Sequence, residues 1–258
     1  EYQKSPHFLP ENKQRVKDKI ANEVLTLLGE GSIKAIDFGC GTGFMIDILL
    51  DHAESVHGID LTQEMLQRVD ISSGRVNLHL GEAEKTPFPK GMFDVATAYS
   101  FLDHISDVNI FFREVYRVLR PGGVFFTGLN PNKFFAEFVG LAAKNDLEAS
   151  RNNPLVNREI LSMLDNGRFY EERYGIPSEI LLCAESIKTN EGGFDANSLV
   201  ASAKKAGLKP VRVSHEWFLG QAAYSNHANG EAIISEYLNK LMPASIPLFK
   251  YIDLIFVK

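Results

Sequence analysis

Three glycines at alternate positions, Gly39, Gly41 and Gly43, follow the acid Asp37 in the run Asp-Phe-Gly-Cys-Gly-Thr-Gly-Phe. Backbone without Cβ atoms lets a ligand lie directly on a turn, and a helix that begins beyond it offers free N–H donors. The apolar residues before the run are typical of a buried strand, and those after it of a helix packed on a sheet. The run therefore predicts a turn that holds a nucleotide-like cofactor, although a purely structural turn would look similar.

A second acid, Asp60, ends the stretch 55–60, which we expect to be the next strand. In nucleotide-binding α/β folds, an acid at the end of the second strand accepts hydrogen bonds from ribose hydroxyls. Asp60 is therefore the strongest single candidate for a cofactor ligand. A helix N-cap is the structural alternative, but Thr62 is better placed for that role.

The glycine spacing distinguishes between cofactor classes. A dinucleotide fingerprint, Gly-x-Gly-x-x-Gly, would need its third glycine at the position of Phe44. Gly-x-Gly-x-Gly after an acid instead resembles the first motif of the seven-stranded class I S-adenosylmethionine (SAM) methyltransferases. Gly-Ile-Asp-Leu-Thr, which includes Asp60 and Leu61, resembles their second motif.

Two further segments resemble the same family. The segment 81–88 is similar to its Gly-Asp-Ala-Glu-x-x-Pro-Phe loop, which holds the adenine. Glu82 stands where aspartate is usual, so the backbone of Ala83 is the safer adenine contact, and Glu84 is expected to be a solvated charge. Leu-Arg-Pro-Gly-Gly, after an expected helix over 107–119, is similar to a family turn that precedes a buried strand.

The resemblance covers residues 33–129 in the family's order and spacing, and it implies SAM as cofactor and S-adenosylhomocysteine as its product. The cofactor-binding residues that it implies are Asp37, Gly39, Cys40, Gly41, Gly43, Phe44, Asp60, Leu61, Glu82, Ala83 and Tyr99.

The end of the expected fourth strand, 93–100, leads into Phe101 and His104. Ligands meet the carboxyl ends of strands in doubly wound folds, so this segment would lie beside the reactive sulfonium. Methyl transfer is an in-line displacement, and an alcohol or phenol acceptor must also lose a proton. His104 suits a general base, since an ordinary histidine has a pKa of ~6.5; acceptor binding and a structural role stay open. Tyr99 and Phe101 are candidates for contacts with the sulfonium, or for core positions. Phe101 is also expected to contact the acceptor.

The segment 130–194 departs from the alternation of strand and helix and predicts several short helices rich in aromatic residues. Directly after the fifth strand, it would cover the carboxyl edge of the sheet and form most of the acceptor pocket. We expect Asn130 and Asn132 at its mouth, with Tyr170 and Tyr174 as further acceptor contacts. A cap that only stabilises the fold is the alternative.

The fold class expected is α/β: a doubly wound, mostly parallel seven-stranded sheet with helices on both faces and a helical cap after the fifth strand. Its expected parts are an N-terminal lid and helix (1–32), a SAM-binding core (33–129), the cap (130–194) and a C-terminal completion of the sheet (195–258). For residues 2–10, a disordered or loosely packed tail is the alternative to a lid. The resemblance implies that the last strand inserts antiparallel beside the fifth. Helices are expected over 11–28, 195–206 and 231–242, and the last two strands over 208–218 and 248–257.

Composition sets further bounds. The net charge of −6 is a modest argument against nucleic acid as substrate. Two cysteines provide neither a disulfide framework nor a metal cluster, so no metal is expected and a reducing, cytoplasmic location is the default. No signal peptide, repeat or apolar run near the ~20 residues of a membrane span is predicted. The oligomeric state is left open.

The sequence thus predicts a SAM-dependent methyltransferase with a small-molecule acceptor, and His104 favours oxygen over nitrogen or carbon as the acceptor atom. Phe44 and the adenine loop disfavour a nicotinamide-dependent oxidoreductase. A nucleic-acid methyltransferase is disfavoured because Asn/Asp-Pro-Pro-aromatic is missing after the fourth strand and neither cysteine follows a proline. A protein methyltransferase and a SAM-binding protein without catalysis on the same fold remain as alternatives.

Overall fold

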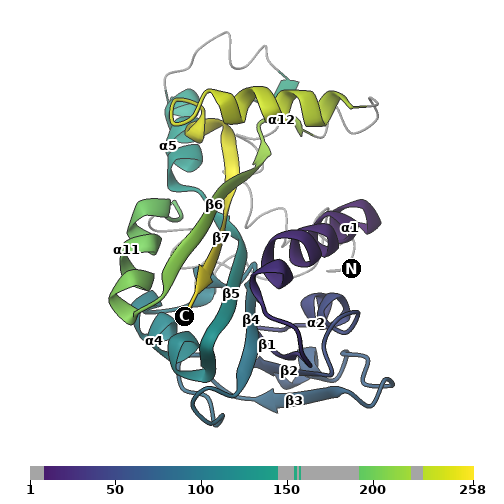
Figure 1. The fold of residues 1–258 in the computed structure, drawn as a ribbon. Helices are drawn as coiled ribbons and strands as arrows, with labels where there is room; N and C mark the ends of the chain where they lie inside the picture. The colour runs from purple at the N-terminus through teal and green to yellow at the C-terminus, as the bar shows by residue number, and fades with distance from the viewer. Residues whose placement is uncertain (1–8, 145–153, 156, 158–191, 222–228) are drawn as a thin grey trace. The chain divides into compact units, whose positions relative to one another are not determined.

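The computed structural model describes residues 9–144, 154–155, 157, 192–221 and 229–258. Seven strands form one sheet in the order β3-β2-β1-β4-β5-β7-β6 (Figure 1). The strands are β1 (Lys34–Phe38), β2 (Ser55–Asp60), β3 (Val76–Leu80), β4 (Phe93–Tyr99), β5 (Leu119–Pro131), β6 (Lys209–Phe218) and β7 (Phe249–Val257). The helices are α1 (Pro10–Lys19), α2 (Phe44–Leu49), α3 (Gln63–Leu66), α4 (Val108–Val118), α5 (Lys133–Lys144), α11 (Ala196–Ala206) and α12 (Gly230–Lys240).

The strand directions confirm a mostly parallel, doubly wound sheet. β1 pairs in parallel with β2 and β4, β2 with β3, and β4 with β5. β7 lies between β5 and β6, and it runs antiparallel to β5. Gly122 donates its N–H to Lys258, whereas Asn132, further along β5, donates to Lys250, earlier in β7.

The described chain forms two compact units. The first comprises Glu1–Gly128, Asn197–Val213 and Leu254–Lys258, and the second Leu129–Ala196 and Ser214–Asp253. Most of β7 and the end of β6 belong to the second unit, together with the segment after β5. The strands β5, β6 and β7 each continue from one unit into the other.

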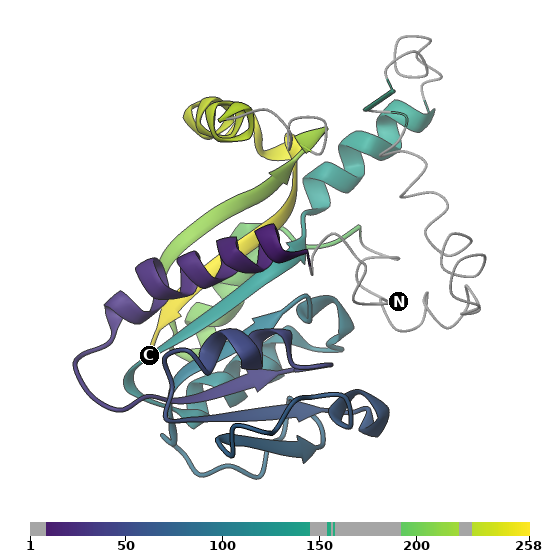
Figure 2. The same cartoon turned by 90° about the vertical axis from the view of Figure 1, so that its right-hand side faces the viewer.

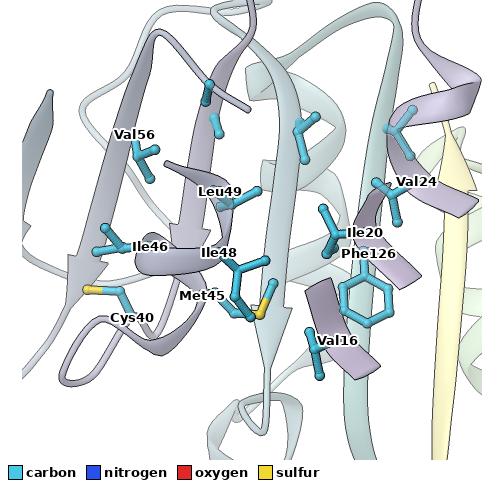
Figure 3. Packing of buried hydrophobic residues seen from close by; sticks show 14 of the residues in the cluster. Val16, Ile20, Val24, Cys40, Met45, Ile46, Ile48, Leu49, Val56 and Phe126 are labelled. Atoms are coloured by element: carbon cyan, nitrogen blue, oxygen red, sulfur yellow. The ribbon is translucent and has the colours of Figure 1, made fainter. Parts of the chain in front are cut away.

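Helices cover both faces of the strands in the first unit (Figures 1 and 2). Residues alternate between faces along a strand, and the neighbours Phe125 and Phe126 show this. Phe126 packs in a cluster with α1 and α2 that includes Val16, Ile20 and Met45 (Figure 3). Phe125 lies against Phe111 and Phe112 of α4 and Phe256 of β7, with ring centroids 6.0 to 6.2 Å apart.

The first helix differs from the single helix expected over 11–28. Regular α-helix ends at Lys19, and a π turn (Ile20–Val24) and a 3₁₀ turn (Leu25–Leu27) follow. A spacing of four residues drifts around an α-helix, and the wider π turn compensates for this drift. Val16, Ile20 and Val24 are therefore all buried on one face.

The start of β5 also differs from expectation. We expected a break at 120–123 and a strand from Val124, but Leu119 already pairs with Phe93 before the register shifts to Val124 with Val95. The expected turn is present as an irregularity within the strand. Gly122 adopts φ 75°, a left-handed conformation that glycine accommodates without strain.

Candidate cofactor site

The glycine turn leaves β1 in left-handed conformations at alternate residues. Gly39, Gly41 and Gly43 have φ values of 63°, 50° and 93°. A Cβ atom on Gly39 would lie 2.0 Å from Cδ2 of Phe101, whereas one on Gly41 would meet nothing within 4 Å. Gly39 is therefore required both by its backbone conformation and by the ring that lies on it.

Asp60 joins the end of β2 to this turn. Its Oδ2 accepts the N–H of Gly41 at 2.9 Å, and its Oδ1 accepts the N–H of Thr62 at 2.9 Å. Thr62 occupies the N-cap position of α3, and its side chain makes no capping bond. An ionised carboxylate has about four acceptor positions, so two main-chain bonds leave Asp60 able to accept ribose hydroxyls.

Asp37 is buried at the end of β1 beside the turn. Thr97 Oγ1 donates to its Oδ1 at 2.7 Å. Burial raises the pKa of Asp37 to about 8; the bond from Thr97 opposes this shift, and the charge of Asp60 adds to it. The side chain is therefore mostly protonated at neutral pH.

Cys40 is buried between β2 and α2. A Cβ atom on Gly58 would lie 2.8 Å from its Sγ and 2.7 Å from Cδ1 of Ile46, so the glycine makes room for both. Burial raises the pKa of the Cys40 thiol, and the nearby Asp37 and Asp60 raise it further. The thiol is thus a packing group, and the main-chain N–H of Cys40 donates to the carbonyl of Ile59 at 3.1 Å.

Exposed apolar side chains lie near Asp60 at the ends of β2 and β3. Leu61 is 69% exposed and Leu80 is 58% exposed, and Leu80 is the strand partner of Asp60. In the following loop, Ala83 is buried and Glu82 is exposed. A purine base needs apolar surface beside main-chain hydrogen-bonding groups, and these residues provide both.

Aromatic packing holds the end of β4. Tyr99 stacks on Phe44 at 5.3 Å between ring centroids, and it also lies beside Phe126 at 6.4 Å. Phe101 packs edge-on against Phe111 at 5.6 Å. Both candidate aromatic residues are thus fixed by packing at the carboxyl end of β4.

His104 ends the short 3₁₀ turn Leu102–His104 that follows β4. Its side chain is 40% exposed, whereas the neighbouring Asp103 is buried. The distance between His104 Nε2 and Asp103 Oδ1 is 4.0 Å. The ring is therefore accessible to a small molecule.

Asn130 and Asn132 differ from the expectation that they line the mouth of a pocket. Both are buried in the second unit. Asn130 Nδ2 donates to the carbonyl of Ile252 at 2.9 Å, and Asn132 Nδ2 donates to those of Ile246 and Phe249 at 2.9 and 2.7 Å. These amides hold β7 in place. Tyr170 and Tyr174 lie outside the described residues.

Sequence reasoning missed an ion pair on α4 that holds the 82–88 loop, in which Glu114 is buried and Arg117 is partly exposed. Glu114 and Arg117 pair across three residues of the helix, with Arg117 Nη2 2.6 Å from Glu114 Oε1. Charged residues spaced i, i+3 within the apolar face of a helix were the available signal. Within the described ranges, no set of three or more His, Cys, Asp or Glu residues is arranged to hold a metal ion, and no helix is long and apolar enough to cross a membrane.

The fold is a doubly wound α/β domain. The glycine turn 39–43, Asp60 and the loop 82–88 lie at the carboxyl ends of β1, β2 and β3. A family model described as a methyltransferase domain matches residues 36–127. Residues 36–127 therefore form a methyltransferase domain similar to that of the class I SAM-dependent methyltransferases.

Two curated relatives illustrate the similarity. A ubiquinone biosynthesis O-methyltransferase of Pseudomonas entomophila is 31% identical over 62% of this chain and 64% of its own length. A demethylmenaquinone methyltransferase of Symbiobacterium thermophilum is 35% identical over 40% of this chain and 45% of its own. The chain matches between 24% and 65% of the length of such relatives, less than two thirds of each.

Among solved structures, a SAM-dependent methyltransferase from Mesorhizobium loti is similar with a TM-score of 0.55. The two sequences are 18% identical, and the match covers 95% of this chain and 100% of the other. This likeness supports the fold.

Proposed function

We propose that this chain binds SAM at the carboxyl ends of β1, β2 and β4 and transfers its methyl group to a small-molecule acceptor. The observation that carries this proposal is the geometry of Asp60, whose carboxylate bonds to Gly41 in the glycine turn and to Thr62. One acid thereby fixes the turn and retains acceptor positions for two ribose hydroxyls.

The remaining cofactor contacts follow from the same arrangement. The exposed Leu61 and the main chain of Ala83 would contact the adenine, with Glu82 beside them. The main chain of the turn, beside Asp37, would contact the methionine part. Tyr99 and Phe101 would lie nearest to the sulfonium, at the end of β4.

We further propose that the acceptor atom is an oxygen. Bound SAM supplies a methyl group made electrophilic by a positively charged sulfur. His104, exposed beside that position, would take the proton of an acceptor hydroxyl as its oxygen forms a bond to the methyl carbon and the bond from carbon to sulfur breaks. Relatives named for O-methylation support this preference, among them the ubiquinone biosynthesis enzyme and a malonyl-[acyl-carrier protein] O-methyltransferase of Serratia marcescens.

Calorimetry of the whole chain with S-adenosylhomocysteine tests the cofactor, with NAD as the control ligand. We expect binding of the first at one site and no binding of the second. Mass spectrometry after incubation with SAM and a set of phenols, amines and activated carbon acids then tests transfer. Folded protein that binds neither SAM nor S-adenosylhomocysteine contradicts the proposal. Binding without transfer to any acceptor favours a SAM-binding protein without catalysis.

A further inference from the structure

The loop 82–88 is anchored to α4 by one buried carboxylate. Glu114 Oε1 accepts the main-chain N–H of Thr86 at 2.8 Å and also the Thr86 hydroxyl. Burial alone would raise the pKa of Glu114, but hydrogen bonds from Arg117 and Thr86 outweigh it and hold the pKa below its ordinary value. The carboxylate is therefore ionised where it holds the loop.

Arg117 completes the anchor from the next turn of α4. Its Nε donates to Glu114 Oε2 at 2.7 Å, and its Nη1 donates to the carbonyl of Phe88 at 2.7 Å. Its Nη2 reaches Glu114 Oε1 at 2.6 Å and the Thr86 carbonyl at 3.3 Å. The guanidinium thus bonds to the helix and to two points of the loop at once.

The ring of Phe88 anchors the end of the same loop. It lies edge-on to His57, His79 and Phe93, with centroids 5.4, 4.7 and 5.1 Å away. The other end is tied to β2, because Gly81 donates its N–H to the carbonyl of Asp60 at 3.0 Å. Only the short stretch that contains Glu82 and Ala83 lies between these fixed points.

We propose that Glu114 and Arg117 are positioning residues that set which base the cofactor site accepts, an inference that rests on the proposed function. They touch no cofactor themselves. By fixing Thr86 and Phe88, they fix the main chain of Ala83, whose N–H would donate to adenine N1. Inosine carries a hydrogen at N1 and an oxygen in place of the adenine amine, so a fixed N–H donor rejects it and a loose loop does not.

A second ion pair in the same unit provides a matched control. Asp94 Oδ1 pairs with Arg120 Nε, and its Oδ2 accepts the N–H of Lys34 at 2.8 Å. The Asp94 carboxylate, like that of Glu114, therefore binds both an arginine side chain and a main-chain N–H. It lies at the amino end of β4, opposite the end that leads to the site. Asp94→Ala is thus expected to lower stability without changing base selectivity.

The experiment compares calorimetric affinities for S-adenosylhomocysteine and S-inosylhomocysteine. We expect the wild type to prefer the adenine compound on the order of 10-fold or more. Glu114→Ala should weaken adenine binding roughly 10-fold and bring the ratio of the two affinities close to one. Glu114→Gln keeps an acceptor for Thr86 and should restore part of the ratio, whereas Asp94→Ala should leave the ratio at the wild-type value.

Several results would overturn the inference. One is a Glu114→Ala variant with a lower melting temperature but the wild-type ratio, since the ion pair is then only structural. If that variant does not fold, the same ratio of affinities is measured for Glu114→Gln and Thr86→Val. A wild-type ratio in both of these variants rejects the inference. A wild type that binds S-adenosylhomocysteine without base preference also rejects it. A wild type that binds neither compound instead rejects the proposed function, and this inference with it.

Discussion

The hydroxyl of Thr97 donates a hydrogen bond of 2.7 Å to the carboxyl of Asp37, and the two residues are strand partners in the parallel pair of β1 and β4. Both side chains are buried. Because burial raises the pKa of Asp37 to about 8, the folded state holds a proton there that the unfolded chain releases near the ordinary value of 3.8. The titration of Asp37 therefore makes the free energy of unfolding of the domain depend on pH.

The first prediction concerns Asp37→Asn. Between about pH 3.8 and about pH 8 the folded state binds more protons than the unfolded state, so this residue makes the free energy of unfolding fall as pH rises. The contribution of Asp37 to the free energy of unfolding is fully present below that pH range, and it is lost as pH rises through the pKa of Asp37 in the folded state. Asparagine is neutral throughout and keeps an acceptor for Thr97. We therefore expect urea unfolding to show the variant gaining stability relative to the wild type from about pH 5 to about pH 9.

Thr97→Val is the control for this prediction. It removes a hydrogen bond that lowers the pKa of Asp37, so the decline in stability should extend to higher pH. Parallel stability curves for Asp37→Asn and the wild type across the whole range would show that Asp37 does not titrate in this way.

The second prediction concerns Asp60→Ala. An ionised acid that accepts ribose hydroxyls contributes roughly 1.5 to 3 kcal/mol per hydrogen bond, so affinity for S-adenosylhomocysteine should fall at least ~10-fold. The bonds from Gly41 and Thr62 are lost as well, and we expect a stability cost of about 1 kcal/mol for each without unfolding the domain. Calorimetry and thermal melting measure the two effects separately.

Asp47→Ala is the matched control for Asp60. Asp47 is exposed on α2 and pairs with Lys13 at 3.1 Å, so its loss removes an acid near the glycine turn without touching the site. We expect unchanged cofactor affinity for this variant. Unchanged affinity in Asp60→Ala as well would leave Asp60 with only the structural role of joining Gly41 to Thr62.

The third prediction separates two requirements for glycine in the turn. Gly41→Ala places a side chain at φ 50° with nothing within 4 Å, so it should cost only the ~1 to 3 kcal/mol of a left-handed backbone. Gly39→Ala adds a Cβ atom 2.0 Å from the ring of Phe101 and should cost about 1 to 3 kcal/mol more. Urea unfolding measures both variants.

The double variant Gly39→Ala, Phe101→Ala tests the cause of that difference. Removing the ring removes the overlap, so the two substitutions together should cost less than the sum of their separate effects. Additive costs would mean that the ring moves aside without penalty and that only the backbone conformation requires Gly39.

Local patterns were sufficient to predict most strands and helices around the candidate site. The strand expected over 55–60 is β2 with the same limits, because apolar alternation and a terminal acid mark it within the segment itself. The link between Asp60 and the glycine turn also follows from parallel order, since the ends of neighbouring parallel strands meet at one edge. The π turn over Ile20–Val24 was not predictable, because the same spacing of apolar residues is compatible with an α-helix.

Contacts between distant residues lie beyond such patterns. Asn130 is a polar residue at the end of a strand, as a pocket residue would be, but its partner is the carbonyl of Ile252 in the last strand. The ring of Phe101 on Gly39 and the bond from Thr86 to Glu114 likewise join segments whose proximity only the folded chain establishes. For this reason the residues that hold the candidate site were harder to predict from the sequence than the elements that carry it.

The last prediction concerns His104, whose exposed ring ends the turn after β4. If it removes the proton of the acceptor, His104→Ala should lower the turnover rate by ~10²-fold or more and leave the affinity for S-adenosylhomocysteine nearly intact. If His104 only holds the acceptor, the KM for the acceptor should rise more than kcat falls. His52→Ala, which removes another exposed histidine in the turn after α2, should change neither quantity. Methylation by His104→Ala at the native rate and with the native KM contradicts both roles, and His104 is then a structural residue of its turn.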